Sequence, residues 1–245
     1  MNASEGQITF NGYTIVKPLF KNERNEIILA NRISDGEKVV LKQSLLRNEN
    51  ILNGSNLGHE YDMLKDLDHK GIPKVYGILF DGKTVALIQE YIEGTDLRKQ
   101  IFKKKISPAE ILDLAIQLSD ILHYIHQKGV VHKDINSSNI MLTKDGTLKL
   151  LDFGISSNLY LETIETLNVD QIEGTLTYIS PEQTGRTAYS VTHSSDFYSC
   201  GVLFYELLAG KLPFDSIDPL EIIHFHLSRN PIHLSSFLPD LPRVL

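Results

Sequence analysis

The chain has 245 residues, of which 42% are hydrophobic and 22% charged, so it is long and apolar enough to bury a sizeable core. A net charge of −7 argues against a general nucleic-acid-binding surface, and a single cysteine excludes an internal disulfide framework and favours a reducing, cytoplasmic compartment. No apolar run approaches the roughly 18 residues of a membrane helix, and the polar N-terminus lacks a signal peptide's apolar core.

The first part of the chain contains short β-like runs, separated by turn signals such as Ser34-Asp35-Gly36. The predicted strands cover residues 13–19, 26–33, 38–43, 74–80 and 84–91. One helical stretch, residues 57–67, interrupts them. These patterns predict a small, β-rich N-terminal lobe over residues 8–92.

Beyond residue 92 the pattern becomes helical. Ser107-Pro108-Ala109-Glu110 is a capping box with proline at the first helical position, and it predicts a helix to about Gln127. A Lys144-Asp145-Gly146 turn between two short apolar runs predicts a β-hairpin. Further helices are expected over residues 197–209, ending at Gly210, and over residues 222–227. The fold class is therefore α+β, with a helical C-terminal lobe over residues 93–245.

Two motifs flank the predicted hairpin. Residues 132–139 read H-K-D-I-N-S-S-N, and residues 152–154 read D-F-G. Alone, the first is readable as a polar loop and the second as a turn after a buried strand. The hairpin would bring Asn139 close to Asp152. Phosphoryl transfer needs a base that orients a hydroxyl and oxygen ligands that hold Mg²⁺ on the phosphates, and the two motifs together predict such a site.

At these motifs the chain resembles eukaryotic-type Ser/Thr protein kinases, whose signatures include H-R-D-L-x-x-x-N and D-F-G. The resemblance implies one bilobal kinase domain over residues 1–245 that transfers the γ-phosphate of Mg-ATP to Ser or Thr hydroxyls of a protein substrate. Asp134 would orient the hydroxyl and accept its proton, and Asn139 and Asp152 would hold Mg²⁺.

The same resemblance assigns residues of the N-terminal lobe to the nucleotide. Lys42 would hold the α- and β-phosphates, and Glu60 would be its ion-pair partner, although an isolated Lys or Glu is usually a surface charge. Gln89 would be the gatekeeper. Asp96 would reach the ribose hydroxyls, with capping of the next helix an equally good interpretation. Contacts with adenine are implied for Leu19, Ile27, Val40, Glu90, Ile92 and Met141.

Two further positions follow from the resemblance in the C-terminal lobe. Residues 174–182 resemble the G-T-x-x-Y-x-A-P-E stretch that closes the activation segment, and Thr175 would bridge to the catalytic aspartate. Asp196 resembles the buried aspartate that steadies the catalytic loop, but an ordinary helix cap explains it as well.

Three departures from the family pattern bear on activity. The phosphate loop, residues 19–27, contains no glycine, although Asn22 and Asn25 tolerate the left-handed conformation that a turn needs. Glu23 and Glu26 would not help to hold a triphosphate. Lys133 replaces an arginine that usually pairs with an activation-loop phosphate, so we expect activity without that phosphorylation. Asn136 stands where a phosphate-contacting lysine is usual, and supplies a hydrogen bond without charge.

These departures keep two alternatives open. A nucleotide-sensing module without catalysis would tolerate the glycine-free loop and Asn136, but the presence of the other expected catalytic residues opposes it. A small-molecule phosphotransferase with a kinase-like fold is the other alternative. The long segment from Asp152 to Glu182 opposes it, because that segment resembles a platform for protein substrates.

A narrower resemblance concerns context. Residues 180–186, S-P-E-Q-T-G-R, with 132–136 and 213–221, look like the N-terminal kinase module of large signalling proteins that continue into an ATPase-like region and a sensor histidine kinase. Further domains of a longer protein are therefore expected partners. Little helix-forming sequence follows residue 227, so we also expect a C-terminal lobe that lacks its last helices. Glu182 would then lack the arginine that usually pairs with it, since Arg243 in its proline-flanked tail is a poor substitute.

Overall fold

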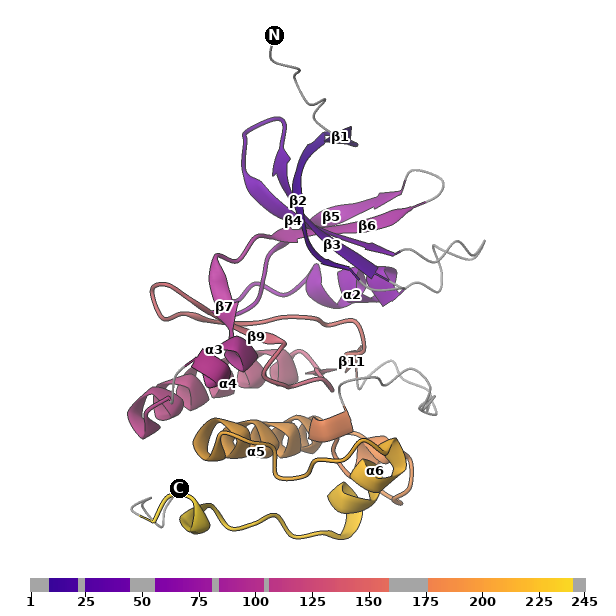
Figure 1. The fold of residues 1–245 in the computed structure, drawn as a ribbon. Helices are drawn as coiled ribbons and strands as arrows, with labels where there is room; N and C mark the ends of the chain where they lie inside the picture. The colour runs from indigo at the N-terminus through magenta and orange to yellow at the C-terminus, as the bar shows by residue number, and fades with distance from the viewer. Residues whose placement is uncertain are drawn as a thin grey trace. The chain divides into compact units, whose positions relative to one another are not determined.

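The computed structural model describes residues 9–21, 25–44, 56–80, 84–103, 106–158 and 176–239. The chain divides into two compact units, Met1–Glu93 and Gly94–Leu245. As predicted, strands are the main regular structure of the N-terminal unit and helices that of the C-terminal unit (Figure 1).

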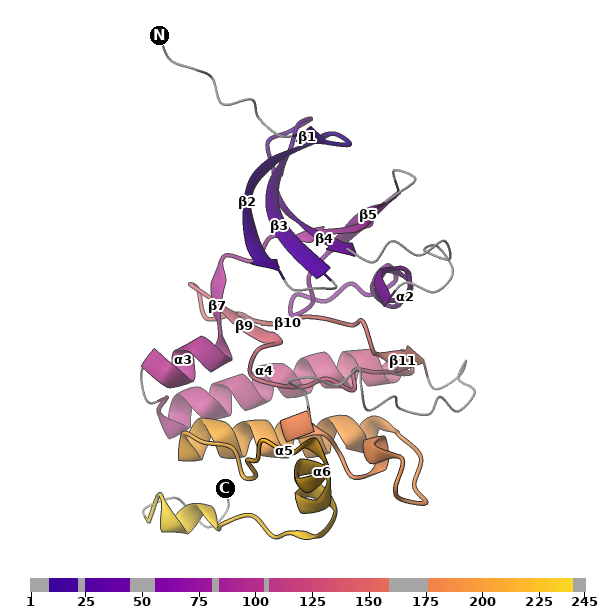
Figure 2. The ribbon, with the colours of Figure 1, turned by 45° about the vertical axis from the view of Figure 1, so that its right-hand side comes forward.

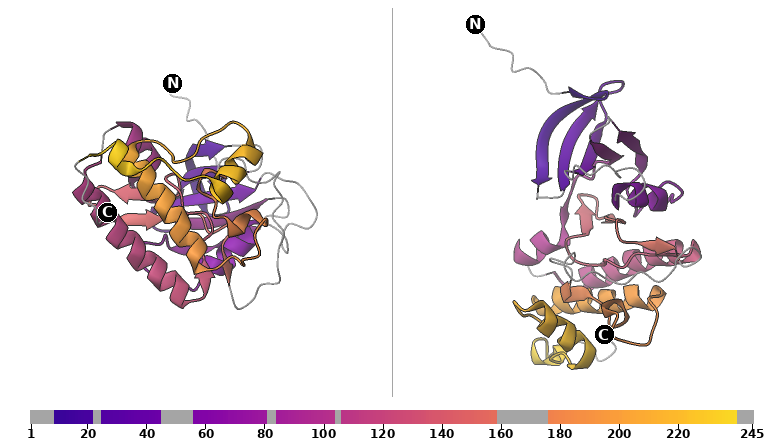
Figure 3. Two further views of the ribbon diagram at one scale, coloured as in Figure 1. Left: turned by 90° about the horizontal axis from the view of Figure 1, so that it is seen from below. Right: turned by 90° about the vertical axis from the view of Figure 1, so that its right-hand side faces the viewer.

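A six-stranded antiparallel sheet forms most of the N-terminal unit, in the order β1-β2-β3-β4-β6-β5. Its strands are β1 Thr9–Phe10, β2 Tyr13–Lys21, β3 Asn25–Arg32, β4 Lys38–Ser44, β5 Val75–Phe80 and β6 Val85–Glu90. The long strands β2 and β3 curve along their length (Figure 3). Five strands, β2 to β6, match the predicted runs within two residues at each end. Asn25 lies within β3 and has no positive φ, so the left-handed turn expected of it is not seen.

The two faces of this sheet make different contacts. Val39 and Leu41 of β4 point into a buried cluster with Ile28, Ala30 and Ile88. Val40 and Lys42, which alternate with them, lie on the opposite face. Helix α2, Asn56–Leu64, packs on that second face through a cluster of Leu57, Val85 and Leu87. The helix ends three residues earlier than predicted, because the chain after Leu64 forms a turn.

The C-terminal unit contains four α-helices within the residues described, together with short strands and 3-10 turns. Its elements are β7 Gly94–Asp96, α3 Leu97–Lys103, α4 Pro108–Gln127, β8 Val130–Val131, β9 Ile140–Thr143, β10 Leu148–Leu150, β11 Ser157–Asn158, η2 Leu176–Tyr178, η3 Glu182–Thr184, α5 His193–Ala209, α6 Pro219–Ser228 and η4 Leu234–Ser236. Helices α4 and α5 run alongside each other, and their contact forms the centre of the unit (Figure 2).

Local sequence explains where these helices begin and end. The predicted capping box starts α4: Ser107 Oγ accepts the Glu110 N–H at 3.3 Å, and the Glu110 carboxylate accepts the Ser107 N–H at 2.8 Å. Helix α5 begins at His193, four residues earlier than predicted, because Thr192 and Ser195 cap it reciprocally. It ends as predicted at Gly210, whose φ of 71° favours glycine.

The predicted hairpin consists of β9 and β10, which pair in register from Ile140 opposite Leu150 to Leu142 opposite Leu148. Gly146, with φ 85°, forms its turn. Strand β7 pairs with the other edge of β9. Gly94 of β7 lies so close to this edge that an added Cβ would stand 2.6 Å from the Leu142 carbonyl oxygen. No helix in the described ranges is long and apolar enough to cross a membrane.

Candidate active site

A buried ion pair lies against the sheet of the N-terminal unit. Lys42 Nζ of β4 is 2.7 Å from Glu60 Oε2 of α2, and their side chains are 12% and 1% exposed. The second oxygen, Glu60 Oε1, accepts a hydrogen bond from Gln89 Nε2 of β6 at 3.3 Å. The predicted pairing of Lys42 with Glu60 is present, and Gln89 is an additional partner that no sequence pattern indicated.

The strand register places several predicted nucleotide contacts on the face that carries Lys42. Ile27 lies directly opposite Lys42, and Val40 lies two residues before Lys42 on the same strand, so all three side chains share one face. Glu90 ends β6, and Ile92 follows it. Leu19 lies at a register shift between β2 and β3 and is 43% exposed. This face therefore combines the apolar side chains of Ile27 and Val40 with the charge of Lys42.

Only the two ends of the predicted phosphate loop are described, because residues 22–24 lie outside the described ranges. Lys21 at the end of β2 pairs with Glu26 across the two strands, with Nζ 3.2 Å from Oε1. The negative charge of Glu26 therefore has a cationic neighbour. This pairing reduces the repulsion that Glu26 would exert on a triphosphate.

The predicted catalytic loop, residues 132–139, called the catalytic loop below, holds the carboxylate of Asp134 with an amide on each oxygen. Asn136 Nδ2 donates to Oδ1 over 2.8 Å, and Asn139 Nδ2 donates to Oδ2 over 2.7 Å. Asn136 is only 7% exposed, and its Oδ1 accepts the backbone N–H groups of Ser138 and Asn139. Rotation of the Asn136 amide would break these bonds. The loop thus fixes the direction in which Asp134 points.

Asp152 stands next to the end of the β9–β10 hairpin. Its φ is 62°, its side chain is exposed, and Oδ1 accepts the Gly154 N–H at 3.3 Å. The neighbouring Leu151 N–H donates to the Asn139 carbonyl at 2.8 Å, so the hairpin brings the two predicted metal ligands together along the backbone. A carboxylate and an amide on neighbouring stretches of backbone are residue types that suit Mg²⁺, because this ion prefers oxygen ligands and completes its shell with water and phosphate.

Asp196 connects the catalytic loop to α5. It is fully buried, and its carboxylate accepts the backbone N–H groups of His132 at 3.0 Å and Lys133 at 2.8 Å. His126 Nε2 of α4 lies 2.7 Å from the same carboxylate. Thr192, not Asp196, caps the helix. The contacts therefore match the loop-steadying interpretation, and the helix-cap interpretation is wrong.

His132 is a second internal support of the loop. Its Nδ1 accepts the Asp134 N–H at 3.2 Å, and its Nε2 faces the Leu151 carbonyl at 3.0 Å. The neutral ring with its proton on Nε2 satisfies both contacts. Complete burial lowers the pKa of His132 below its usual value, which keeps the ring in this form.

The remaining predicted positions in this unit are Asp96, Met141, Thr175 and Glu182. Asp96 Oδ1 accepts the Lys99 N–H at 2.8 Å, so Asp96 caps α3 as the second interpretation predicted. Met141 lies in β9, partly buried. Thr175 lies outside the described residues. Glu182 was expected to lack its usual arginine partner. Its Oε1 accepts a 2.6 Å hydrogen bond from the neutral Ser195 Oγ, and Arg243 lies outside the described residues.

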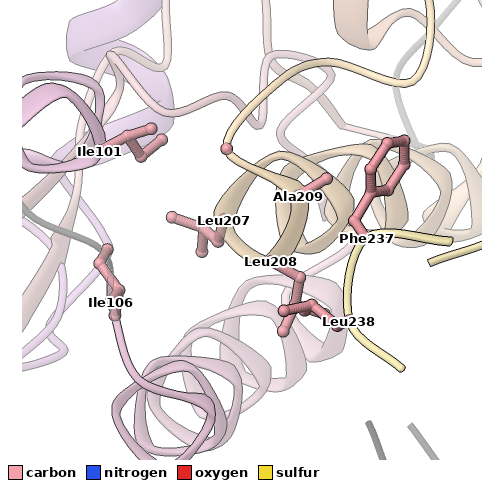
Figure 4. A pocket seen from close by; sticks show the side chains of 8 residues that line it. Ile101, Ile106, Leu207, Leu208, Ala209, Phe237 and Leu238 are labelled. Carbon is pink, nitrogen blue, oxygen red and sulfur yellow. The ribbon is translucent and has the colours of Figure 1, made fainter. Parts of the chain in front are cut away.

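A cavity of about 300 Å³ lies elsewhere in the C-terminal unit (Figure 4). Apolar residues from α3, the end of α5 and the chain after η4 line it, namely Ile101, Ile106, Leu207, Leu208, Ala209, Phe237 and Leu238, together with Gly210. None of these is a predicted site residue. A lining without charged or polar side chains supplies neither a base nor a metal ligand, so this cavity is not the site of phosphoryl transfer.

Comparisons with known proteins agree with this geometry. A family model described as the protein kinase domain matches residues 23–235. The Aurora/IPL1-related protein kinase 2 of Caenorhabditis elegans is 32% identical over 216 residues, which cover 87% of this chain and 68% of that protein. A probable serine/threonine-protein kinase of Clostridium acetobutylicum is 34% identical over 175 residues, or 71% of this chain.

The serine/threonine-protein kinase pkn2 of Myxococcus xanthus is 28% identical over 252 residues, which cover the whole of this chain. The alignments span 26% of the length of the Clostridium relative and 30% of the Myxococcus relative. The similarity to these bacterial proteins therefore concerns one part of each.

Proposed function

The chain belongs to the protein kinase domain family, and on this premise we propose that it transfers the γ-phosphate of Mg-ATP to serine or threonine hydroxyls of a protein substrate. One observation carries the proposal. Asp134 is held by an amide on each carboxylate oxygen, at 2.8 and 2.7 Å, in a loop anchored to the buried Asp196. A carboxylate of fixed direction is what orientation of an acceptor hydroxyl requires.

Each proposed role follows from the surroundings of the residue. Lys42, fixed by Glu60, would bind the α- and β-phosphates. Asp134 would accept the hydroxyl proton as the hydroxyl oxygen bonds to the γ-phosphorus and the bond to the β–γ bridging oxygen breaks, so that ADP leaves. Asp152 and the amide oxygen of Asn139 would hold Mg²⁺. When bound, that ion supplies charge neutralisation at the phosphates. Asn136 donates to Asp134, so we assign it to the orientation of the base.

Transfer of radiolabelled phosphate from ATP to a mixed protein substrate tests the proposal. We expect label on serine and threonine after hydrolysis of the product to amino acids, and none above background with Asp134→Asn. Asp113→Asn, a carboxylate in the exposed part of α4, is the matched control and should retain activity. Label that is equal with Asp134→Asn, or absent with the wild type, would contradict the proposal.

A second candidate is a nucleotide-binding module that does not transfer phosphate. Asn136 favours it, because both ends of its amide are occupied within the loop and it brings no positive charge to the phosphates. ATP binding without transfer in the same experiment would identify this function. A small-molecule phosphotransferase would instead label a small acceptor and leave protein unlabelled.

The cellular setting is part of the proposal. We infer that the domain acts in the cytoplasm, since the one cysteine, Cys200, is a buried free thiol, which suits a reducing compartment. The resemblance of residues 180–186 and 132–136 to kinase modules of large signalling proteins supports further domains as partners. Purification of the protein from its native source would test this, since we expect the kinase domain and such domains in one polypeptide.

A further inference from the structure

Lys133, which immediately precedes Asp134, has an unusual backbone conformation. Its φ is 67°, a left-handed value that lysine rarely adopts, so the surrounding structure must hold it there. Its N–H donates to Asp196 Oδ1 at 2.8 Å. The direction in which Asp134 leaves the loop depends on this conformation. The contacts of the Lys133 peptide groups therefore bear directly on the orientation of the proposed base.

The carbonyl of Lys133 is held by Gln183, fifty residues away in η3. Gln183 Nε2 donates to this oxygen at 2.8 Å. Gln183 Oε1 accepts two hydrogen bonds from Ser180, one from the N–H at 3.2 Å and one from Oγ at 2.9 Å. Gln183 is 6% exposed and Ser180 is fully buried. The Ser180 N–H must face the amide oxygen of Gln183, and the Lys133 carbonyl must face its amide nitrogen. Only one orientation of the Gln183 amide satisfies both contacts.

A second bridge holds the other side of the same loop. Ser137 Oγ and Tyr178 OH are 2.8 Å apart, and the Tyr178 hydroxyl also donates to Glu206 Oε2 of α5. Burial raises the pKa of Tyr178, so the phenol stays neutral and keeps its proton for this chain of bonds. Residues 133 and 137, on either side of Asp134, are thus both bound to residues 178–183.

We propose that Gln183 is a positioning residue for phosphoryl transfer: it locks the Lys133 carbonyl and so holds Asp134 in its working orientation. The lock, meaning the hydrogen bonds of Gln183 to the Lys133 carbonyl and to Ser180, consists of neutral groups. It joins the catalytic loop to the segment that begins at η2. This inference rests on the proposed kinase activity, and it adds a residue that acts on Asp134 through the Lys133 carbonyl.

Two substitutions separate positioning from packing. Gln183→Met keeps the length of the side chain but removes the donor, so we expect kcat to fall at least tenfold while the KM for ATP changes less than twofold. In Gln183→Glu the ionised carboxylate repels the Lys133 carbonyl, whereas the protonated form can donate to it. The activity of Gln183→Glu relative to wild type should therefore rise as the pH falls from 8 to 6.

Gln117→Met is the matched control. Gln117 also bridges two backbone groups of the same unit, because its Nε2 donates to the Gly146 carbonyl at 3.0 Å and its Oε1 accepts the Leu148 N–H at 2.8 Å. It supports the β9–β10 hairpin turn and not the catalytic loop. Its replacement should lower the melting temperature and leave kcat per folded molecule unchanged.

Hydrogen exchange of the backbone amides of residues 132–139 completes the test, since it does not require activity. We expect faster exchange at Lys133 and Asp134 in Gln183→Met but wild-type exchange there in Gln117→Met. Unchanged exchange in Gln183→Met, or an unchanged kcat in an active enzyme, would overturn the positioning role. An inactive wild type whose loop exchange still responds to Gln183→Met would overturn the proposed kinase activity and leave the lock intact.

Discussion

The two units hold their functional side chains by different means. In the N-terminal unit the charge of Lys42 faces the opposite charge of Glu60, and both groups are largely buried. In the C-terminal unit the carboxylate of Asp134 is held by the neutral amides of Asn136 and Asn139, and the Lys133 carbonyl by the neutral amide of Gln183. Loss of a partner in the first case leaves a buried charge uncompensated, whereas in the second it alters mainly orientation. Substitutions should therefore affect stability in one unit and turnover in the other.

The largest effect is expected at the proposed metal ligand. Asp152→Ala should abolish the Mg²⁺ dependence of ATP binding, because it removes the only carboxylate assigned to the ion. Calorimetric titration of ATP with and without Mg²⁺ measures this. Asp145→Ala, an exposed carboxylate in the hairpin turn, is the control and should keep the dependence. Equal ATP affinity in both conditions for the wild type would show that the site does not use the metal.

The ion pair should give the clearest loss of stability. Glu60→Gln removes the counter-ion of a lysine that is 12% exposed, and we expect a fall of about 3 kcal/mol in the free energy of unfolding, with weaker ATP binding. Denaturant titration measures the first effect. Asp62→Asn, which breaks the exposed pair with Lys65, should leave stability unchanged. If both variants were equally stable, the contrast between the units would disappear.

A buried histidine in α6 should make the C-terminal unit sensitive to acid. Burial lowers the pKa of His226 to about 4, and Tyr198 OH lies 2.8 Å from its Nδ1. The unfolded chain binds a proton near pH 6.5, where the folded ring is still neutral. Stability should therefore fall by up to about 1.4 kcal/mol per pH unit as the pH drops from 6.5 to 4. Thermal melts of wild type and His226→Gln across this range should show a smaller pH dependence in the variant. Equal pH dependence would contradict the prediction.

The smallest effect is expected from four serines and threonines after Asp152, which are candidate acceptors of a regulatory phosphate because they lie in the segment that resembles an activation loop. Ser156 and Ser157 are buried, and Ser156 Oγ donates to the His132 carbonyl at 3.1 Å, while Thr163 and Thr166 lie outside the described residues. Because Asp196 and Gln183 hold the catalytic loop without a phosphate, alanine at all four positions should leave kcat within a few-fold of wild type. Complete loss of activity in a folded protein would contradict this prediction.

Local sequence patterns were sufficient for most of the fold. The capping box at Ser107 and the glycine at 210 predicted the start of α4 and the end of α5, because each acts on backbone groups within one turn. The start of α5 was misplaced, since Thr192 with Ser195 is a weaker signal than the apolar run that follows. The pairing of Lys42 with Glu60 came from resemblance, because neither residue is distinctive alone.

The bridges around the site were not predictable in this way. Gln89 contacts Glu60 across 29 residues, Ser137 contacts Tyr178 across 41, and Gln183 contacts Lys133 across 50. No periodicity marks a side chain that bonds so distant a partner. The left-handed φ of Lys133 was not predictable either, because only glycine or asparagine at this position would have indicated such a conformation.

The rate of phosphate transfer by Asp134→Asn tests the central claim most directly. The substitution keeps the shape of the side chain and removes the proton acceptor. It should lower kcat by about 10²–10⁴ while ATP affinity and the melting temperature stay at wild-type values. An unchanged rate in this folded, ATP-binding variant would contradict the assignment of Asp134 as the base, and with it the role of the catalytic loop in orienting that base.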